Sequence, residues 1–356
     1  MSNFIETIVE KENKVLAGLE QCKENGFPTY LLGDGEGAGN AELRAGGFKF
    51  AGRLVNRKYY VKKPGVFCLE EVLDSTEDKV NLLVAHRGFI EESLREYSDK
   101  IGVFINYDFF AGNCTVDPSL MTYKWVQDNE SDLERAYVGL NDDYSRRVMS
   151  AYINQKISSD YKYLKEVKTY PQYFEDIMPL SDDEVFIDCG AFDGDSAAAF
   201  ISALHKRNIS GYKKIISFEP DPINFEKLKK RGFENHECIN KGTSKEKGEL
   251  KFSVLGTSSG FDKNGEITVP IDSLDNEIHE AVTLIKMDIE GAELASLEGG
   301  KGLISGCKPK MAICIYHKKE DLWEIQNYLQ QLVPEYKFYI RAYEDTATEL
   351  VLYAIP

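Results

Sequence analysis

Two segments of this 356-residue chain each read as a buried strand that ends in a glycine-rich turn and leads into a helix. The first is FPTYLLGDGEGAGNAEL at residues 27–43, and the second is EVFIDCGAFDGDSAAAF at residues 184–200. Such a turn places backbone N–H groups at a helix N-terminus, where α/β proteins hold nucleotide-like ligands. The pattern therefore predicts an α/β protein with two candidate ligand sites.

Strands alternate with helices in two stretches of the chain that are separated by a helical stretch. Residues 1–112 predict a smaller Rossmann-like α/β domain, and residues 179–356 predict a second α/β domain. Residues 113–178 show helical periodicity and predict a connector, which is either a solvated linker or a lid over the second domain. The chain ends in YKFYIRAY and TELVLYAI, two alternating strands that predict a C-terminal antiparallel hairpin on a parallel sheet.

The overall charge and the cysteines limit the classes of partner. A formal net charge of -16 argues against nucleic acid, because neutralising phosphates requires clustered Lys and Arg. The seven cysteines form no CxxC pair, which fits reduced thiols rather than disulfides or a zinc site. The first residues lack a signal-peptide core and no apolar run reaches membrane-spanning length, so we expect a cytoplasmic protein without a membrane span.

The second glycine turn has the chemistry of a site for a cation rather than for a phosphate. Asp188, Asp193 and Asp195 surround the turn, and no Walker lysine follows it. Glu219 ends the next strand, where a carboxylate can accept both hydroxyls of a ribose. An NAD enzyme uses the same carboxylate, but the acidic turn would repel a pyrophosphate. These features favour S-adenosylmethionine, which has a ribose, an adenine and a sulfonium cation but no phosphate.

The later part of the chain resembles the FkbM-type methyltransferases, within the class I S-adenosylmethionine-dependent enzymes. The resemblance covers residues 140–356 and rests on five blocks in order, which are DCGAFDGDS, FEPDP, LIKMDIEGAE, ICIYHKKEDLWEI and the ending YIRAY…ELVLYAIP. It implies a seven-stranded class I methyltransferase sheet, Rossmann-like and closed by the hairpin, and methylation of hydroxyl oxygens on sugars and secondary metabolites. Many relatives have Asn where Phe192 stands, so this position departs from the family pattern.

The resemblance also implies which residues bind the cofactor. Asp188, Gly190 and Gly194 are expected to position its methionine part, and Glu219 its ribose. Asp221 lies near the ribose and adenine in this scheme, but it fits equally well as a helix N-cap. The complete set expected to bind the cofactor is Asp188, Gly190, Ala191, Asp193, Gly194, Ser196, Glu219, Asp221, Asn240 and Asp288.

Two residues are candidates for accepting the proton of the methyl acceptor. Methyl transfer is an in-line displacement for which a protein supplies mainly alignment and desolvation, but a sugar hydroxyl is a poor nucleophile without a base. Asp288 and His317 each follow a core strand, at the edge where class I enzymes bind substrate, so either one is expected to take the proton. The alternative is that His317 caps a turn and Asp288 only orders a loop. A magnesium ion held by Asp288, Glu290 and Glu293 is a further alternative, which we do not favour.

The first glycine turn contains a degenerate dinucleotide fingerprint, G-x-G-x-x-A, at Gly33, Gly35 and Ala38. The next strand ends in Asn56 rather than in a carboxylate for a ribose, which disfavours an NAD-linked sugar oxidoreductase. This domain is loosely similar to the front domains of sugar-modifying enzymes, which implies either binding of a nucleotide-linked or carrier-linked sugar or a homodimer face. A non-catalytic binding protein on a methyltransferase fold is the third alternative.

Overall fold

The computed structural model describes residues 3–35, 38–39, 42, 47–84, 91–106, 121–253, 260–261 and 267–356. The chain divides into two compact units. Unit 1 comprises Met1–Glu130, Ser150–Glu166 and Asp345–Ala347, and unit 2 comprises Ser131–Met149, Val167–Glu344 and Thr348–Pro356. The segment predicted as a connector, residues 113–178, therefore contributes to both units. None of the helices in the described part of the chain has the length and apolar character needed to cross a bilayer.

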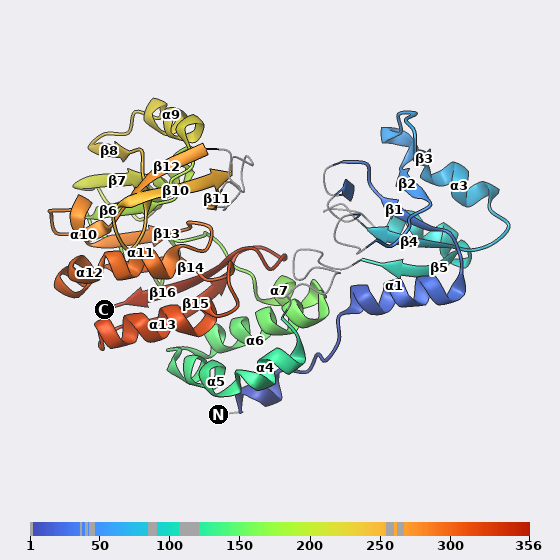
Figure 1. The fold of residues 1–356 in the computed structure, drawn as a ribbon, viewed down its shortest axis with the longest axis horizontal. Coiled ribbons are helices and arrows are strands. Elements are labelled where there is room, and N and C mark those ends of the chain that lie inside the picture. The colour runs from blue at the N-terminus through green and yellow to red at the C-terminus, as the bar shows by residue number, and fades with distance from the viewer. Residues whose placement is uncertain are drawn as a thin grey trace. The chain divides into compact units, whose positions relative to one another are not determined.

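Unit 1 is built on a five-stranded parallel sheet in the order β3-β2-β1-β4-β5 (Figure 1). The order reverses direction between β1 and β4, as expected for a Rossmann-like sheet. The strands are β1 (Thr29–Leu32), β2 (Gly52–Val55), β3 (Val66–Cys68), β4 (Val80–Val84) and β5 (Ile101–Ile105). The helices are η1 (Phe4–Thr7), α1 (Lys14–Asn25), η2 (Arg57–Tyr59), α3 (Leu69–Ser75) and η3 (Glu91–Lys100).

Local sequence signals set the ends of α1. Asn13 begins the helix, because its side-chain oxygen accepts hydrogen bonds from the N–H groups of Val15 and Leu16 at 3.0 and 3.1 Å. Gly26 ends it in the left-handed conformation, with φ of 69°. One face of α1 packs on the sheet in a cluster that consists of Val15, Leu19, Cys22, Leu31, Leu83 and Ile105.

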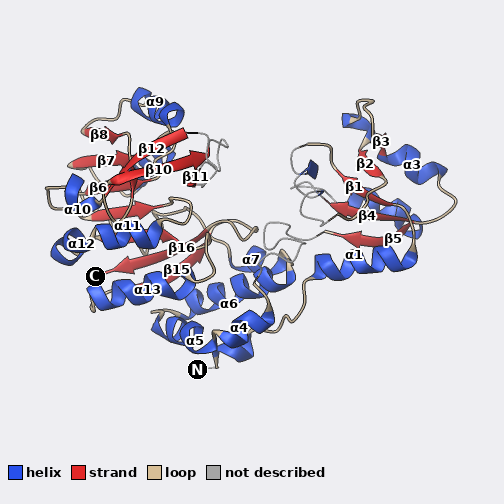
Figure 2. Cartoon of the chain, viewed as in Figure 1, coloured by secondary structure: helices blue, strands red, loops and turns tan. Residues whose placement is uncertain are grey.

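Four helices follow β5 along the chain and are shown with the other helices in Figure 2. They are α4 (Tyr123–Asp128), α5 (Glu130–Gly139), α6 (Asp143–Ser158) and α7 (Lys162–Val167). The helical periodicity of this segment is thus confirmed for the described residues. Thr122 begins α4 by accepting a hydrogen bond from the N–H of Trp125 at 3.1 Å.

Unit 2 contains a seven-stranded sheet in the order β15-β16-β14-β13-β6-β7-β8 (Figure 1). Strand β16 is antiparallel to both β14 and β15, and the remaining pairs are parallel. This is the class I methyltransferase sheet with the predicted C-terminal hairpin. Its strands are β6 (Val185–Cys189), β7 (Lys214–Phe218), β8 (His236–Ile239), β13 (Leu284–Met287), β14 (Lys310–Cys314), β15 (Lys337–Ala342) and β16 (Leu350–Ile355).

Further helices of unit 2 lie between these strands in the chain. They are α8 (Asp195–Lys206), α9 (Pro222–Lys230), α10 (Leu274–Glu277), α11 (Glu293–Gly299), α12 (Lys301–Cys307) and α13 (Asp321–Leu332). Under α8 the core is aromatic, with the rings of Phe174, Phe186 and Phe200 at centroid distances of 4.9 to 5.8 Å. The core therefore fixes the segment before β6, which carries Phe174, against the sheet.

A second, smaller sheet lies between β8 and β13 in the chain. Its strand order is β11-β10-β12-β9, with bounds β9 (Gly242–Thr243), β10 (Gly248–Ser253), β11 (Gly260–Phe261) and β12 (Ile267–Asp272). Strand β10 pairs with β12 in antiparallel fashion. The main sheet is not interrupted by this insertion. The carboxyl ends of the parallel strands β6, β7 and β13 are neighbours in it, and the candidate site lies at these ends.

Candidate functional site

The turn between β6 and α8 requires glycine for two separate reasons. Gly190 and Gly194 have φ of 77° and 91°, a region that side chains other than glycine rarely adopt. In addition, a Cβ atom on Gly190 would lie 1.9 Å from the carbonyl oxygen of Asp288. The turn and the end of β13 are therefore in direct backbone contact, and the N–H of Asp288 donates to the carbonyl of Cys189 at 3.1 Å.

Asp188 lies beneath this turn and forms an ion pair with Lys286 of β13. The Lys286 Nζ is 3.1 Å from Asp188 Oδ1, and the two side chains are 3% and 0% exposed. Burial raises the pKa of Asp188 to about 6, although the charge of Lys286 opposes this rise. Lys286 also donates to the carbonyl of Gly190 at 2.7 Å. Asp188 therefore supports the glycine turn through Lys286.

The turn carries less uncompensated negative charge than its sequence indicates. Asp193 accepts a hydrogen bond from Arg231 Nη2 at 2.8 Å, and its carbonyl accepts from Arg231 Nε. Since Asp188 is paired with Lys286, two of the three predicted carboxylates have a cationic partner. Asp195 is exposed at the first turn of α8.

Glu219 is the best placed of the predicted ribose ligands. Its two carboxylate oxygens accept hydrogen bonds from the N–H groups of Phe192 and Asp221 at 2.7 and 2.8 Å, which fixes the side chain and leaves further lone pairs. Burial raises the pKa of Glu219 to about 7, although these two hydrogen bonds oppose the rise. Phe192 has φ of 47°, a left-handed region that Asn tolerates better than Phe, so the turn would also accept Asn at this position.

The other predicted cofactor residues have mainly local roles. Asp221 caps α9, since it accepts hydrogen bonds from the N–H groups of Ile223 and Asn224 at 2.7 and 3.2 Å and is 1% exposed. Asn240 donates to the carbonyl of Glu219 at 2.7 Å and so orders the end of β7. Ala191 and Ser196 are buried in the turn and in the first turn of α8.

Asp288 lies at the end of β13 and is surrounded by donors. Tyr173 donates to its Oδ2 at 3.1 Å, and Tyr316 donates to its Oδ1 at 3.2 Å. His317 Nε2 is 3.6 Å from the same Oδ1. Asp288 and His317, the two residues predicted as proton acceptors, therefore belong to one cluster.

The imidazole of His317 lies among three carboxylates. Its Nδ1 is 3.1 Å from Glu293 Oε1, its Nε2 is 3.5 Å from Glu290 Oε2, and its side chain is 9% exposed. Burial lowers the pKa of His317, but the contact with Glu293 and the charges of Asp288 and Glu290 outweigh burial and raise the pKa to about 9. At neutral pH His317 is therefore an imidazolium, which holds no free lone pair. Of the two predicted proton acceptors, the geometry favours Asp288.

The same cluster brings together groups that could hold a metal ion. The ligand atoms of Asp288, Glu293 and His317 lie within 4.8 Å of one another, as do those of Asp288, Cys314 and Glu349. These sets do not fit magnesium, which prefers oxygen ligands and several waters, because each contains a nitrogen or sulfur donor. The positive charge of the imidazolium also compensates part of the negative charge of the carboxylates. Neither of these sets among the described residues is the trio Asp288, Glu290 and Glu293 that was the alternative site for a magnesium ion.

Several residues of the site had not been predicted. Lys286 interrupts the apolar run LIKMDI, and a lysine in a buried strand needs a partner, so its position was a signal that could have been used. Tyr173 and Tyr316 gave no such signal, since aromatic residues are ordinary in a core. Glu349 precedes β16 and accepts a hydrogen bond from Gln172 at 2.6 Å. Burial, followed by the charge of Asp288, raises the pKa of Glu349 to about 7.

The first glycine turn lies in unit 1, at the end of β1. Gly33 has φ of 118°, and Asp34 forms an ion pair with Lys63 at 2.9 Å. Gly35 and Ala38 are described, and Ala38 is buried, whereas residues 36–37 lie outside the described part of the chain. Asn56 follows β2, so no carboxylate stands at the position where a dinucleotide site has one.

The sheet order and the glycine turn define a class I methyltransferase fold. Residues 188–342 match the family described as methyltransferase FkbM domain, the family that the sequence blocks had indicated. A comparison with curated proteins finds no match to the chain.

One solved structure supports the fold, and other solved structures match about half of the chain. The crystal structure of methyltransferase FkbM from Methylobacillus flagellatus KT matches with a TM-score of 0.76 and 22% sequence identity, covering 100% of this chain and 94% of that chain. An rRNA methylase from Streptococcus thermophilus matches with a TM-score of 0.32 and 18% identity, over 49% of this chain and 87% of its own. A Streptococcus mutans protein described as a methyltransferase in complex with SAH matches with a TM-score of 0.32 and 14% identity, over 49% and 90%.

Proposed function

We propose that this protein is an S-adenosylmethionine-dependent methyltransferase that methylates a hydroxyl oxygen of a sugar, a glycan or a small hydroxylated metabolite. The observation that carries the proposal is the backbone contact between Gly190 and Asp288. This contact brings the glycine turn and the carboxylate of Asp288 to the same end of the sheet. A methyl donor on the turn and a proton acceptor beside it are the two parts that this reaction needs. The donor and the acceptor class rest on the family resemblance.

The residues around the turn fit the proposed cofactor. Glu219 retains lone pairs for the two hydroxyls of a ribose, and the left-handed glycines let the backbone approach a ligand closely. Asp195, which is exposed in the first turn of α8, offers the negative charge that a sulfonium cation favours. When bound, S-adenosylmethionine supplies an electrophilic methyl group with a good leaving group.

The chain's own residues then prepare the acceptor. Asp288 takes the proton of the acceptor hydroxyl as the oxygen attacks the methyl carbon. Tyr173 and Tyr316 fix the carboxylate by hydrogen bonds to its two oxygens. His317 is a positioning residue in this scheme, because its Nε2 lies 3.6 Å from Asp288 Oδ1 and orients the carboxylate.

Ligand-induced thermal stabilisation tests the proposal. S-adenosylhomocysteine should raise the melting temperature of the full chain, because a ligand that binds only the folded state stabilises it, whereas NAD should not. Radiolabelled methyl transfer to a panel of mono- and oligosaccharides then tests the acceptor class. Stabilisation by NAD alone would favour the oxidoreductase alternative. Stabilisation by S-adenosylhomocysteine without transfer to any hydroxylated acceptor would favour a non-catalytic binding protein.

Unit 1 has two proposed roles, binding of a nucleotide-linked or carrier-linked sugar or formation of a homodimer. We place the protein in the cytoplasm, which agrees with the free cysteines of the described chain, Cys22, Cys68, Cys189, Cys238, Cys307 and Cys314. Calorimetric titration with nucleotide sugars and light scattering of the full chain distinguish the two roles. Heat of binding without dimerisation would support the first, and a dimer without heat of binding the second.

A further inference from the structure

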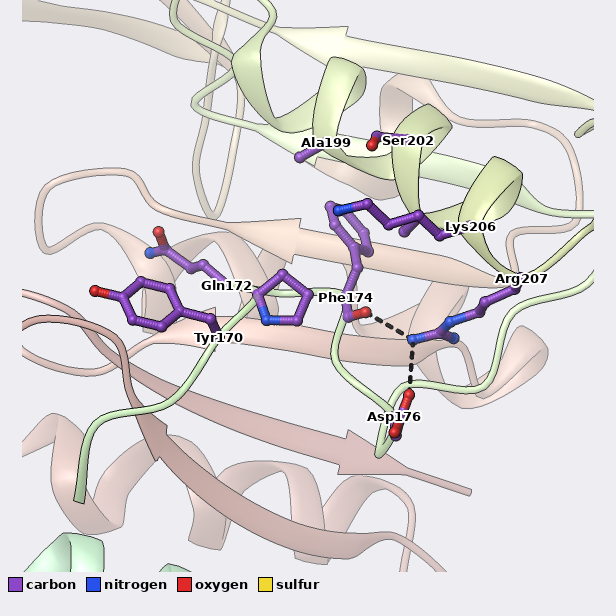
Figure 3. A pocket seen from close by; sticks show the side chains of 10 residues that line it. Tyr170, Gln172, Phe174, Asp176, Ala199, Ser202, Lys206 and Arg207 are labelled. Carbon is purple, nitrogen blue, oxygen red and sulfur yellow. Dashed lines mark hydrogen bonds and ion pairs between the residues drawn. The ribbon is translucent and has the colours of Figure 1, made fainter.

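A groove of about 490 Å³ lies in unit 2, between α8 and the loop that precedes β6 (Figure 3). Its volume falls in the range of small-molecule sites, roughly 300–1,000 Å³. The helix contributes Ala199, Ser202, Ala203 and Lys206, which lie three or four residues apart and so share one helical face. Three of these four are small, so the helix surface leaves the space that larger side chains would fill.

The loop wall of the groove is fixed in place. Arg207 donates to the carbonyl of Phe174 at 2.6 Å (Figure 3) and to the carbonyls of Met178 and Glu175 at 2.6 and 2.9 Å, so its guanidinium holds the loop. The ring of Phe174 packs into the aromatic core, 5.6 Å from Phe200. The groove is therefore largely preformed, as small-molecule sites usually are.

The lining mixes a large ring with hydrogen-bonding groups. Tyr170 is 66% exposed at the end of the groove opposite Lys206 in Figure 3, so its ring presents an apolar face to solvent. Gln172, Ser202 and Lys206 supply donors and acceptors along the groove. An aliphatic lipid would leave these polar groups without partners. A nucleotide is disfavoured by the net charge of -16.

A saccharide satisfies both parts of this lining. The C–H face of a sugar ring is apolar and can stack on an exposed aromatic ring, while its hydroxyl groups donate to and accept from amide, hydroxyl and ammonium groups. Saccharide binding would also account for an exposed tyrosine beside a helix face that carries small side chains.

The loop also connects the groove with the candidate reaction site. Gln172 lines the groove and donates to Glu349 at 2.6 Å, while the adjacent Tyr173 donates to Asp288. Residues on one side of the loop thus face the groove, and Tyr173 on the other side fixes the proposed proton acceptor. We propose that this groove binds a saccharide, as the part of a glycan acceptor that lies beyond the sugar unit to be methylated. This inference rests on the proposed function for the identity of the acceptor.

An array of immobilised neutral and acidic oligosaccharides, probed with the full chain, tests the groove directly. Ser202→Trp fills the groove from an exposed helix position, and Tyr170→Ala removes the aromatic ring on which the sugar would stack. Each should weaken oligosaccharide binding by about tenfold or more, the loss of one good contact. His205→Trp is the matched control, because His205 is an exposed α8 residue outside the groove, and its binding should stay within about twofold of the original chain.

Stabilisation by S-adenosylhomocysteine, measured on the same variants, separates the two proposals. The groove proposal is supported if Ser202→Trp and Tyr170→Ala reduce oligosaccharide binding while His205→Trp preserves it. This holds whether or not S-adenosylhomocysteine binds. Failure of S-adenosylhomocysteine to stabilise any of the proteins contradicts the proposed function alone. The groove proposal is overturned if the original chain binds no oligosaccharide, if the groove variants bind as well as the control, or if mononucleotides displace the bound saccharide.

Discussion

The Asp188–Lys286 pair is a buried ion pair in which each charge depends on the other. Lys286→Met leaves the Asp188 carboxylate buried without its cation, and such a loss costs about 3–5 kcal/mol of unfolding free energy. Asp188→Asn combined with Lys286→Met removes both charges, so the double variant should be more stable than Lys286→Met alone. Urea unfolding of the three proteins measures this coupling. Equal unfolding free energies for the single and the double variant would show that the pair does not interact as described.

His317 makes the stability of unit 2 depend on pH. Its pKa is raised from 6.5 to about 9, so the folded state binds the proton more tightly than the unfolded state. The resulting stability is fully present below pH 6.5 and is lost as the pH rises through about 9, with a total of the order of 3 kcal/mol. In His317→Gln this contribution should be absent. The measurement is the unfolding free energy between pH 6 and 9.5, and parallel curves for the two proteins would contradict the assignment.

Asp288 is the residue on which the proposed chemistry depends. Asp288→Asn keeps the size of the side chain and can still accept a hydrogen bond from Tyr173 or Tyr316, but an amide does not take a proton. Methyl transfer should fall by about 10²–10⁴-fold, the usual contribution of a general base. Stabilisation by S-adenosylhomocysteine, measured on the same variant, separates loss of proton transfer from loss of cofactor binding, since Asp288 is also in the set expected to bind the cofactor. Full transfer activity in Asp288→Asn would exclude this residue as the base.

The sequence was informative where a residue type has one dominant use. Gly190 and Gly194 were expected in a turn, and both have positive φ. Glu219 was expected at the end of its strand, and it lies there with two N–H donors. The protonation state of His317 could not be predicted, because it depends on three carboxylates whose convergence is fixed only by the packing of two loops.

At the scale of single elements, the β6–α8 turn depends on close approach as well as on glycine conformation. Gly190→Ala meets the carbonyl of Asp288, whereas Gly232→Ala meets nothing within 4 Å although Gly232 also has a positive φ, of 62°. Gly232→Ala should cost only the left-handed strain, about 1–2 kcal/mol. Gly190→Ala should cost at least about 2 kcal/mol more, because packed backbone relaxes poorly, and should lose stabilisation by S-adenosylhomocysteine. Equal costs for the two variants would show that the turn is not in contact with β13.

Strand and helix prediction succeeded for elements with a clear period. The apolar runs of β6, β7, β13 and β14 and the alternating hairpin of β15 and β16 were all expected from their patterns. The small sheet around β10 and β12 was not, because short strands with many exposed residues show the same local pattern whether they join a main sheet or pair separately. The groove between α8 and the loop was equally hidden, since it results from tertiary packing and not from a motif.

At the scale of the whole molecule, each unit has a core of its own. Unit 1 packs α1 against its sheet through Leu31, while unit 2 has the aromatic core beneath α8. Domains with separate cores can unfold in separate steps, so calorimetry should resolve two thermal transitions. Leu31→Ala creates a cavity in unit 1 and should lower only one of them, by about 2–5 kcal/mol of unfolding free energy.

S-adenosylhomocysteine should act on the other transition. All residues of the proposed cofactor site belong to unit 2, so a ligand at 100 times its dissociation constant should add about 2.7 kcal/mol to the transition that Leu31→Ala leaves unchanged. The assignment does not depend on which transition occurs at the lower temperature, because the variant and the ligand identify the two units independently. If the ligand raises the transition that Leu31→Ala lowers, the cofactor binds in unit 1 and the first glycine turn is the functional one. If the two changes move a single cooperative transition, the units unfold together and do not have independent stability.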